Sequence, residues 1–303
     1  MNFQNLFEMQ AMLFLIMFLG TFLKLRGMIT KRGKQLLTDL VVSVTLPCSI
    51  FKSFQMELPD HVFQTFLVVF LVALGIQVGS YVLSLILYPG MKEQRKKVLQ
   101  YATICSNAGI LGNPIAEGIF GSLGLLYASI YLIPQRIFMW SVGLTYFTQA
   151  ENWKKLVKKV VTHPCIVAVV LGMAVMIFGI PVPGFVSLAI KNVAGANTAV
   201  SMLLIGSILA DLPVRELADK EAVYYTVIRL ILIPLLVYGA CLFLGIDSLV
   251  MGVSVVLAAM PAASTTAVLA SKYHADEVFA TKCVVLSTLC SVVSIPAWCF
   301  VLA

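Results

Sequence analysis

The chain has 303 residues, of which 60% are hydrophobic and only 12% are charged, and its formal net charge is +7. Ordinary soluble domains are about 45 to 50% apolar and about 25% charged, so this composition excludes a soluble enzyme, a disordered chain and a secreted domain. The basic residues lie in short stretches beside hydrophobic runs, which argues against a nucleic-acid partner.

Ten stretches of the chain are long and apolar enough to cross a bilayer as helices, which takes about 20 residues each. They lie near residues 6–25, 36–55, 62–88, 98–120, 124–148, 161–180, 185–210, 221–245, 248–271 and 278–302. We therefore predict an all-α polytopic membrane protein with ten transmembrane helices.

The basic residues predict how these helices are oriented. Sixteen of the 21 Lys and Arg residues lie in the odd-numbered loops between the spans, whereas the even-numbered loops and both termini contribute only Lys52. Because Lys and Arg favour cytoplasmic loops, we expect the odd loops in the cytoplasm and the N- and C-termini outside.

The spans divide into two sets of five, residues 1–150 and 161–303, joined by a basic cytoplasmic linker at 151–160. Because five is an odd number, the second set must be inverted relative to the first. The fourth span contains Asn113-Pro114 and the ninth contains Met260-Pro261, about half the chain apart. Interrupted helices at corresponding positions of two halves indicate an inverted-repeat transporter whose site lies at the repeat interface.

The fourth span predicts the start of a new half-helix at Asn113. Asparagine is a good N-cap and Pro114 suits the first helical position, while Gly109 and Gly112 permit unwound backbone before it. The start of a helix presents free N–H groups and the positive end of the helix dipole, which together suit an anion.

In the ninth span, small residues surround Pro261 and three hydroxyl residues follow it, Ser264, Thr265 and Thr266, where a carboxylate could bind. Two such interruptions crossing each other would direct two positive helix ends at one cavity. The alternative is a pair of proline kinks in two ordinary helices.

Three charges within the spans require a partner or a role, because a central Arg or Lys costs about 2.5 to 3.5 kcal/mol on insertion. Arg136, in the middle of the fifth span, either binds a substrate carboxylate or balances the charge of the site, or it forms a fixed pair with an acid such as Glu117. Glu117 follows the Asn113-Pro114 break by one turn and could instead carry a coupling proton. For Arg229, in the eighth span, snorkelling to the cytoplasmic surface and a functional role remain open.

The residues at these breaks resemble the auxin efflux carrier family over the whole chain. The resemblance rests on Asn107-Ala108-Gly109-Ile110-Leu111-Gly112-Asn113-Pro114, on Leu46-Pro47, and on Ala259-Met260-Pro261 followed by Ala270-Ser271-Lys272-Tyr273. The sequence looks like a bacterial member, related to the plant PIN auxin carriers and to malate and malonate permeases. The resemblance implies a multi-pass protein of the bacterial plasma (inner) membrane. It also implies a scaffold of spans 1, 2, 6 and 7, a transport domain of the other six that moves like an elevator, and a substrate carboxylate near Asn113, Pro114 and Pro261.

The resulting hypothesis is a secondary active or potential-driven transporter of small organic anions, mono- or dicarboxylates, working by alternating access. The candidate substrate-binding residues are Asn107, Gly112, Asn113, Pro114, Arg136, Pro261, Ser264 and Thr265, and the candidates for proton or ion coupling are Glu117 and Thr266. The alternative is a sodium- or proton-coupled symporter or antiporter of the bile-acid or cation type. Because the ninth span contains no carboxylate, a sodium site there has little support from the sequence.

We expect neither an enzyme nor a cofactor. The sequence has no GxxxxGK[ST], HExxH or GxSxG motif, its cysteines lie in apolar runs without Cys-x-x-Cys spacing, and its three histidines are too scattered to predict a metal site. The expected partners are the lipid bilayer and a small organic anion, without nucleic acid, and a homodimer is compatible with the sequence.

Overall fold

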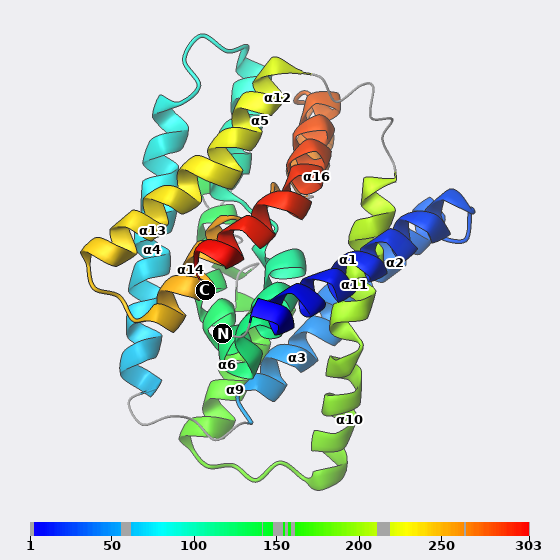
Figure 1. The fold of residues 1–303 in the computed structure, drawn as a ribbon, viewed down its shortest axis with the longest axis vertical. Helices are drawn as coiled ribbons and strands as arrows, with labels where there is room; N and C mark the ends of the chain where they lie inside the picture. Colours follow the sequence, from blue (N-terminus) through cyan, green and yellow to red (C-terminus); the bar gives the residue numbers. More distant parts are fainter. Residues whose placement is uncertain are drawn as a thin grey trace.

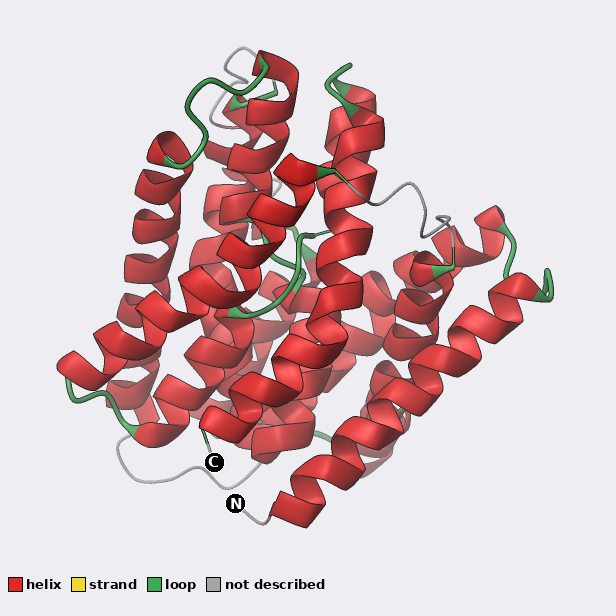
Figure 2. Cartoon of the chain, turned by 45° about the horizontal axis from the view of Figure 1, so that its top comes forward, coloured by secondary structure: helices red, strands yellow, loops and turns green. Residues whose placement is uncertain are grey.

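The computed structural model describes residues 3–55, 62–140, 142–147, 154, 157–158, 161–210, 219–263 and 265–302. Within these residues all regular elements are helices, and the β pairing is a single isolated bridge (Figure 2). The all-α prediction is therefore confirmed for the part of the chain that the structure describes.

The first half of the chain contains α1 (Phe3–Leu25), α2 (Lys31–Leu40), η1 (Val41–Thr45), α3 (Leu46–Ser53), α4 (Val62–Ile86), α5 (Glu93–Ile104), η2 (Ala108–Gly112), α6 (Asn113–Trp140) and α7 (Val142–Thr145). The second half contains α9 (Pro164–Ile177), α10 (Gly184–Gly195), α11 (Asn197–Leu209), α12 (Lys220–Val227), η4 (Ile228–Leu232), α13 (Ile233–Phe243), α14 (Ser248–Ala258), α15 (Thr265–Lys272) and α16 (Glu277–Val301). The label η marks a π-helical turn.

Six of the helical segments in the described residues are long and apolar enough to cross a membrane. They are Lys31–Lys52, Gln64–Ile86, Ala108–Met139, Gly184–Leu209, Lys220–Phe243 and Glu277–Val301. Shorter apolar helices cover Ala11–Leu25, Pro164–Ile177 and Ser248–Ala258. Five of the six coincide with predicted spans, whereas Ala108–Met139 joins parts of the fourth and the fifth. Inside it Gly121, at φ 69° and ψ −162°, separates two helical pieces without an intervening loop.

The outer surface of α4 suits lipid. Leu67, Leu71, Leu74, Val78 and Val82 are all exposed and recur every three or four residues, so they form one stripe along the helix. A continuous apolar stripe of this length is costly in water and is stable against lipid acyl chains.

The helices form two groups (Figure 1). In the first group α1 runs along α11, and α3 packs against α9 and α10. In the second group α6 packs against α4 and α14, while α16 packs against α12 and α15. The groups meet where α3 contacts α6 and where α11 contacts η2 and α16. This boundary passes beside the first interrupted helix, at η2.

The contact between α1 and α11 depends on glycines that let the two backbones meet. A Cβ atom built on Gly206 would overlap the carbonyl of Met17, and one on Gly20 would overlap the backbone of Leu203. Thr21 Oγ1 donates a hydrogen bond of 2.9 Å to the carbonyl of Gly206 across the same contact. Small residues and hydroxyl groups are how membrane helices pack closely in the absence of a hydrophobic driving force.

Among the described residues, the π turns η1, η2 and η4 each end two residues before a proline, namely Pro47, Pro114 and Pro234. Proline cannot donate to the carbonyl four residues before it, and its ring clashes with that carbonyl in a regular α-helix. A wider turn moves the carbonyl away from the ring, so these prolines are accommodated inside continuous helices. The carbonyl that is left must find another donor.

At Pro234 that donor is visible. Trp298 Nε1 on α16 donates a hydrogen bond of 2.8 Å to the carbonyl of Leu230, four residues before the proline. We expect Trp298→Phe to lower the free energy of unfolding by about 1 to 3 kcal/mol, because it leaves a buried carbonyl without a donor. Thermal unfolding of the purified protein in detergent measures this loss. The loss should shrink in a Pro234→Ala background, where a backbone N–H returns, and an equal loss in both backgrounds would contradict this explanation.

One ion-pair cluster joins three helix starts of the second group. Arg95, in the first turn of α5, contacts Asp219 at 3.2 Å, Glu221 at 2.7 Å and Asp276 at 3.2 Å, and its guanidinium lies 4.5 Å from the centre of the Phe279 ring. Asp219 and Asp276 also cap α12 and α16 through backbone N–H groups. The cluster therefore holds α5 in register with α12 and α16 at the end predicted to face the cytoplasm.

Candidate functional site

The two predicted interruptions exist and lie against each other in the interior of the molecule. The N–H of Asn107 donates to the carbonyl of Pro261 at 2.8 Å, and the N–H of Ala263 donates to the carbonyl of Cys105 at 3.1 Å. Ser106 and Ala262 are thereby paired in an antiparallel bridge. We call residues 105–107 and 259–263, together with the helix ends beside them, the crossover.

Neighbouring helices satisfy the rest of this unwound backbone. Gln135 Nε2 donates to the carbonyl of Ser106 at 2.8 Å, and Ser287 Oγ accepts from the N–H of Ala262 at 3.1 Å. Unwound backbone at membrane depth is stable only where protein or water supplies such partners. The observed hydrogen bonds show that the interruptions are built into the fold and are more than proline kinks.

The new half-helix of the fourth predicted span begins at Ala108, so the prediction that it begins at Asn113 is wrong. Asn113 has helical φ −59° and ψ −49°, its N–H bonds the carbonyl of Ala108, and it caps nothing. The π turn η2 explains the difference, because it lets Pro114 lie inside a helix that has already started. Asn107 takes the position before the first turn, although its side chain makes no cap hydrogen bond.

Asn113 and Gly112 nevertheless remain at the crossover. Asn113 is 0% exposed, and neither its Oδ1 nor its Nδ2 has a hydrogen-bond partner in the structure. A Cβ on Gly112 would lie 2.7 Å from Leu257 Cδ2 and 3.1 Å from Met260 Cγ, so glycine allows η2 to approach α14 closely. A buried amide without partners has unused capacity to bind a polar ligand.

Arg136 lies over the start of η2. A Cβ on Gly109 would be 2.6 Å from Arg136 Nη2, so the missing side chain makes room for the guanidinium. Arg136 Nε is buried without a hydrogen-bond partner, and the contact of Nη1 with Met139 Sδ, at 3.8 Å, is weak. Among the described residues no carboxylate lies within ion-pair distance of Arg136. The guanidinium is thus a cation with free donors beside a helix start.

The second half-helix, α15 (Thr265–Lys272), follows the second interruption. Thr265 Oγ1 accepts a hydrogen bond of 3.2 Å from Tyr101 on α5, and Thr266 Oγ1 is buried without a partner. Ser264, the first of the predicted hydroxyl residues, lies outside the described residues. The start of α15 therefore adds a second set of helix N–H groups and one unused hydroxyl to the crossover.

Glu117 does not pair with Arg136, so that alternative is wrong. Its Oε2 accepts a hydrogen bond of 3.3 Å from Ser49 on α3, across the boundary between the two helix groups. Lys52 follows Ser49 by one turn on the same helix. Glu117 is half-buried. The carboxyl group therefore lies at the boundary between the two helix groups.

Sequence reasoning did not place Arg229 at the crossover. Its side chain is 4% exposed, which excludes snorkelling to the surface. Nε donates to the carbonyl of Met260 at 2.8 Å and Nη1 to that of Thr103 at 3.0 Å. The sequence carried one signal, a charge within an otherwise apolar run just before Pro234, but nothing in it showed which helices the charge would reach.

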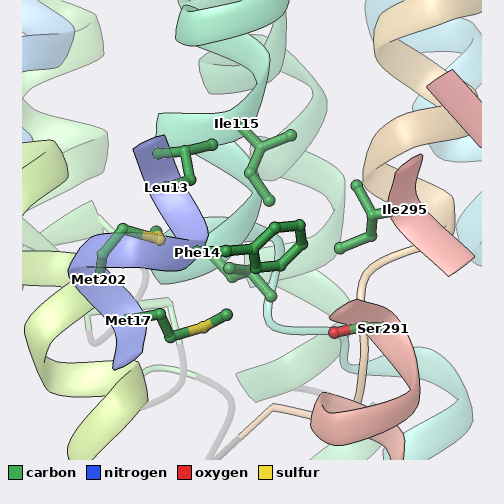
Figure 3. A pocket seen from close by; sticks show the side chains of 8 residues that line it. Leu13, Phe14, Met17, Ile115, Met202, Ser291 and Ile295 are labelled. Carbon is green, nitrogen blue, oxygen red and sulfur yellow. The ribbon is translucent and has the colours of Figure 1, made fainter. Parts of the chain in front are cut away.

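The boundary between the helix groups is closely packed beside the crossover. The cavity drawn in Figure 3 lies there. Its volume is about 20 Å³, enough for about one water molecule but too small for an organic anion. It is lined by Leu13, Phe14, Met17, Leu111, Ile115, Met202, Ser291 and Ile295.

Interrupted helices that cross inside a lipid-exposed bundle are the arrangement of secondary transporters, which bind their substrates near the middle of the membrane. Comparison with known proteins agrees with this class. The sequence profile of a family described as "Membrane transport protein" matches residues 6–299. The chain belongs to this family of membrane transporters, and the resemblance to auxin efflux carriers is confirmed.

The chain is also similar over nearly its whole length to several curated proteins. An "Uncharacterized transporter" of Methanothermobacter thermautotrophicus is 28% identical over 100% of both chains. "Uncharacterized transporter MJ1031" of Methanocaldococcus jannaschii is 24% identical, covering 95% of this chain and 96% of its own. "Uncharacterized transporter YfdV" of Escherichia coli is 26% identical over 94% of both chains. The protein is thus a multi-pass membrane transporter.

Proposed function

We propose that this protein is a secondary transporter of small organic anions, mono- or dicarboxylates, which bind at the crossover. The observation that carries the proposal is Arg136, an intramembrane guanidinium with a buried unpartnered Nε, which lies over Gly109 in the first turn of η2. A planar guanidinium can hold a carboxylate through two parallel hydrogen bonds. The helix starts at Ala108 and Thr265 add N–H groups and dipole ends of the right sign.

The remaining candidate residues complete this binding site. Asn107 and Pro261 define the pairing that sets the two helix starts side by side. The buried amide of Asn113 supplies both a donor and an acceptor, and Thr266 supplies a hydroxyl. Ser264 extends the same stretch of hydroxyl residues in the sequence. These groups would distinguish one carboxylate from another, because a buried polar group left unpaired by the wrong substrate costs binding energy.

The movement we propose is a displacement of the second helix group against the first. The first group holds predicted spans 1, 2, 6 and 7, and the second holds the other six, as expected for a scaffold and an elevator-type transport domain. Ten spans in two inverted sets would place both termini on the outside of a bacterial inner membrane. The start of α1 and the end of α16 lie near each other in both views, which agrees with an even number of crossings (Figures 1 and 2).

Uptake into proteoliposomes tests this function. The purified protein would be offered a panel of labelled mono- and dicarboxylates, with membrane potential, proton gradient and sodium gradient imposed one at a time. We expect accumulation of at least one carboxylate that empty liposomes do not show. Failure to transport any carboxylate under any gradient would refute the anion proposal.

Proton coupling is the second candidate, and the position of Glu117 favours it. The carboxyl group bonds Ser49 across the boundary of the two groups, so its protonation would change a contact that must break during sliding. We expect Glu117→Gln to retain uptake driven by membrane potential and to lose the response to a proton gradient. Glu93→Gln, at an exposed position of α5, is the matched control. An unchanged response in Glu117→Gln would assign coupling elsewhere, with sodium at Thr266 as the next candidate.

A further inference from the structure

The guanidinium of Arg229 joins the two half-helices that lead into the crossover. It donates to the carbonyl of Thr103, in the last turn of α5, and to that of Met260, two residues after α14. The last carbonyls of a helix have no N–H partner within the helix. One side chain therefore satisfies a carbonyl at the open end of α5 and a carbonyl of the unwound segment after α14, which come from distant parts of the chain.

The charge of Arg229 is compensated by these carbonyl ends. No carboxylate lies within ion-pair distance of it among the described residues. The C-terminal end of a helix carries partial negative charge and is stabilised by a cation. The rigid fork of donors on arginine can reach two carbonyls at once, which the single ammonium group of lysine does less well.

The turn that carries Arg229 is itself attached on two sides. Tyr225, one turn earlier, donates its hydroxyl to the carbonyl of Ala102 at 3.0 Å, next to the carbonyl that Arg229 binds. Trp298 on α16 holds the carbonyl of Leu230. These two hydrogen bonds fix the turn that carries Arg229 relative to α5 and α16, so the guanidinium is held in place where it contacts the second interrupted helix.

We infer that Arg229 is a positioning residue for the crossover. It holds the carbonyl ends of α5 and α14 together, which keeps Asn107 paired with Pro261 and Ala263 paired with Cys105. It also cancels the negative ends of these half-helices, so that the positive ends beside Arg136 dominate the field at the anion. The second role rests on the proposed function, whereas the first concerns the fold alone.

Hydrogen–deuterium exchange of the full-length protein in detergent tests the inference without a substrate. In Arg229→Ala we expect the amides of Asn107 and Ala263 to exchange about tenfold faster or more, because two charge-assisted hydrogen bonds are lost. Amides of α1 and α11 should keep their rates. Guanidinium ion at low millimolar concentration should restore protection at the crossover, while sodium at equal ionic strength should not. Arg26→Ala, which removes an exposed arginine, is the control.

Wild-type exchange at Asn107 and Ala263 in Arg229→Ala would overturn the inference. Faster exchange that extends equally to α1 and α11 would also overturn it, and so would faster exchange that guanidinium does not reverse. If the alanine variant cannot be purified in a folded state, Arg229→Lys provides the test. We expect the lysine variant to lose protection at one of the two amides, and full protection at both would contradict a role for two carbonyls. If the exchange results hold but no carboxylate is transported, the anion proposal fails together with the second role of Arg229, and its positioning role stands.

Discussion

Arg136→Ala is expected to lower the uptake of the transported carboxylate about a hundredfold while the protein stays folded, because two charge-assisted hydrogen bonds to the substrate are lost. Arg136→Lys should recover only part of this loss, since an ammonium group keeps the charge without the paired donors. Initial uptake rates in proteoliposomes, with thermal unfolding as the check on folding, measure both effects. Lys191→Ala, which removes an exposed charge from α10, should transport like wild type.

Gly109→Ala provides a companion test of the same group without removing it. The added Cβ would lie 2.6 Å from Arg136 Nη2, and the guanidinium is the end of a flexible side chain that can move aside. We therefore expect normal folding and a raised KM, with a smaller change in the maximal rate. Wild-type kinetics in both Gly109→Ala and Arg136→Ala would show that the anion site lies elsewhere.

Gly206→Ala is expected to be the most destabilising of the conservative substitutions considered, by about 3 kcal/mol. Its Cβ would overlap the backbone of Met17, and a backbone can yield only if α1 and α11 separate. The hydrogen bond from Thr21 Oγ1 to the Gly206 carbonyl would be lost at the same time. The thermal unfolding midpoint in detergent measures the change.

Gly75→Ala is the matched control for this substitution. Gly75 also lies in the middle of a membrane helix, but a Cβ there meets no atom within 4 Å. Alanine should leave the protein as stable as wild type or slightly more stable, because it has the higher helix propensity. Equal unfolding midpoints for Gly206→Ala and Gly75→Ala would contradict the close packing of α1 on α11.

The features that could be predicted from the sequence are those that a short stretch of residues determines by itself. Hydrophobic length predicted the helical class, and Met260-Pro261 marked the second interruption correctly. Arg136 stood out because a charge is rare in an apolar span. The pairing of the two interruptions was expected from their corresponding positions in the two halves, and the hydrogen bonds of Asn107 and Ala263 now show it.

The errors concern features that depend on residues distant in the sequence or on where a helix begins. Asn113-Pro114 has the composition of a helix start, but the π turn before it allows the helix to begin at Ala108. Glu117 follows Asn113-Pro114 by one turn, which made Arg136 a candidate partner, whereas its partner Ser49 comes from another helix group. No local pattern could show that Arg229 reaches two carbonyls contributed by α5 and α14.

The π turns η1, η2 and η4 matter when this chain is aligned with its relatives. A π turn adds one residue to a helical turn, so every side chain after it points about 100° away from the direction that an uninterrupted α-helix would give it. Which residues of α6 face α3 and which face α14 therefore depends on η2 as well as on the sequence of α6 itself. A relative without the proline and its wide turn should need a one-residue gap at that place, and an ungapped alignment would assign its membrane-facing and site-facing positions to the wrong sides.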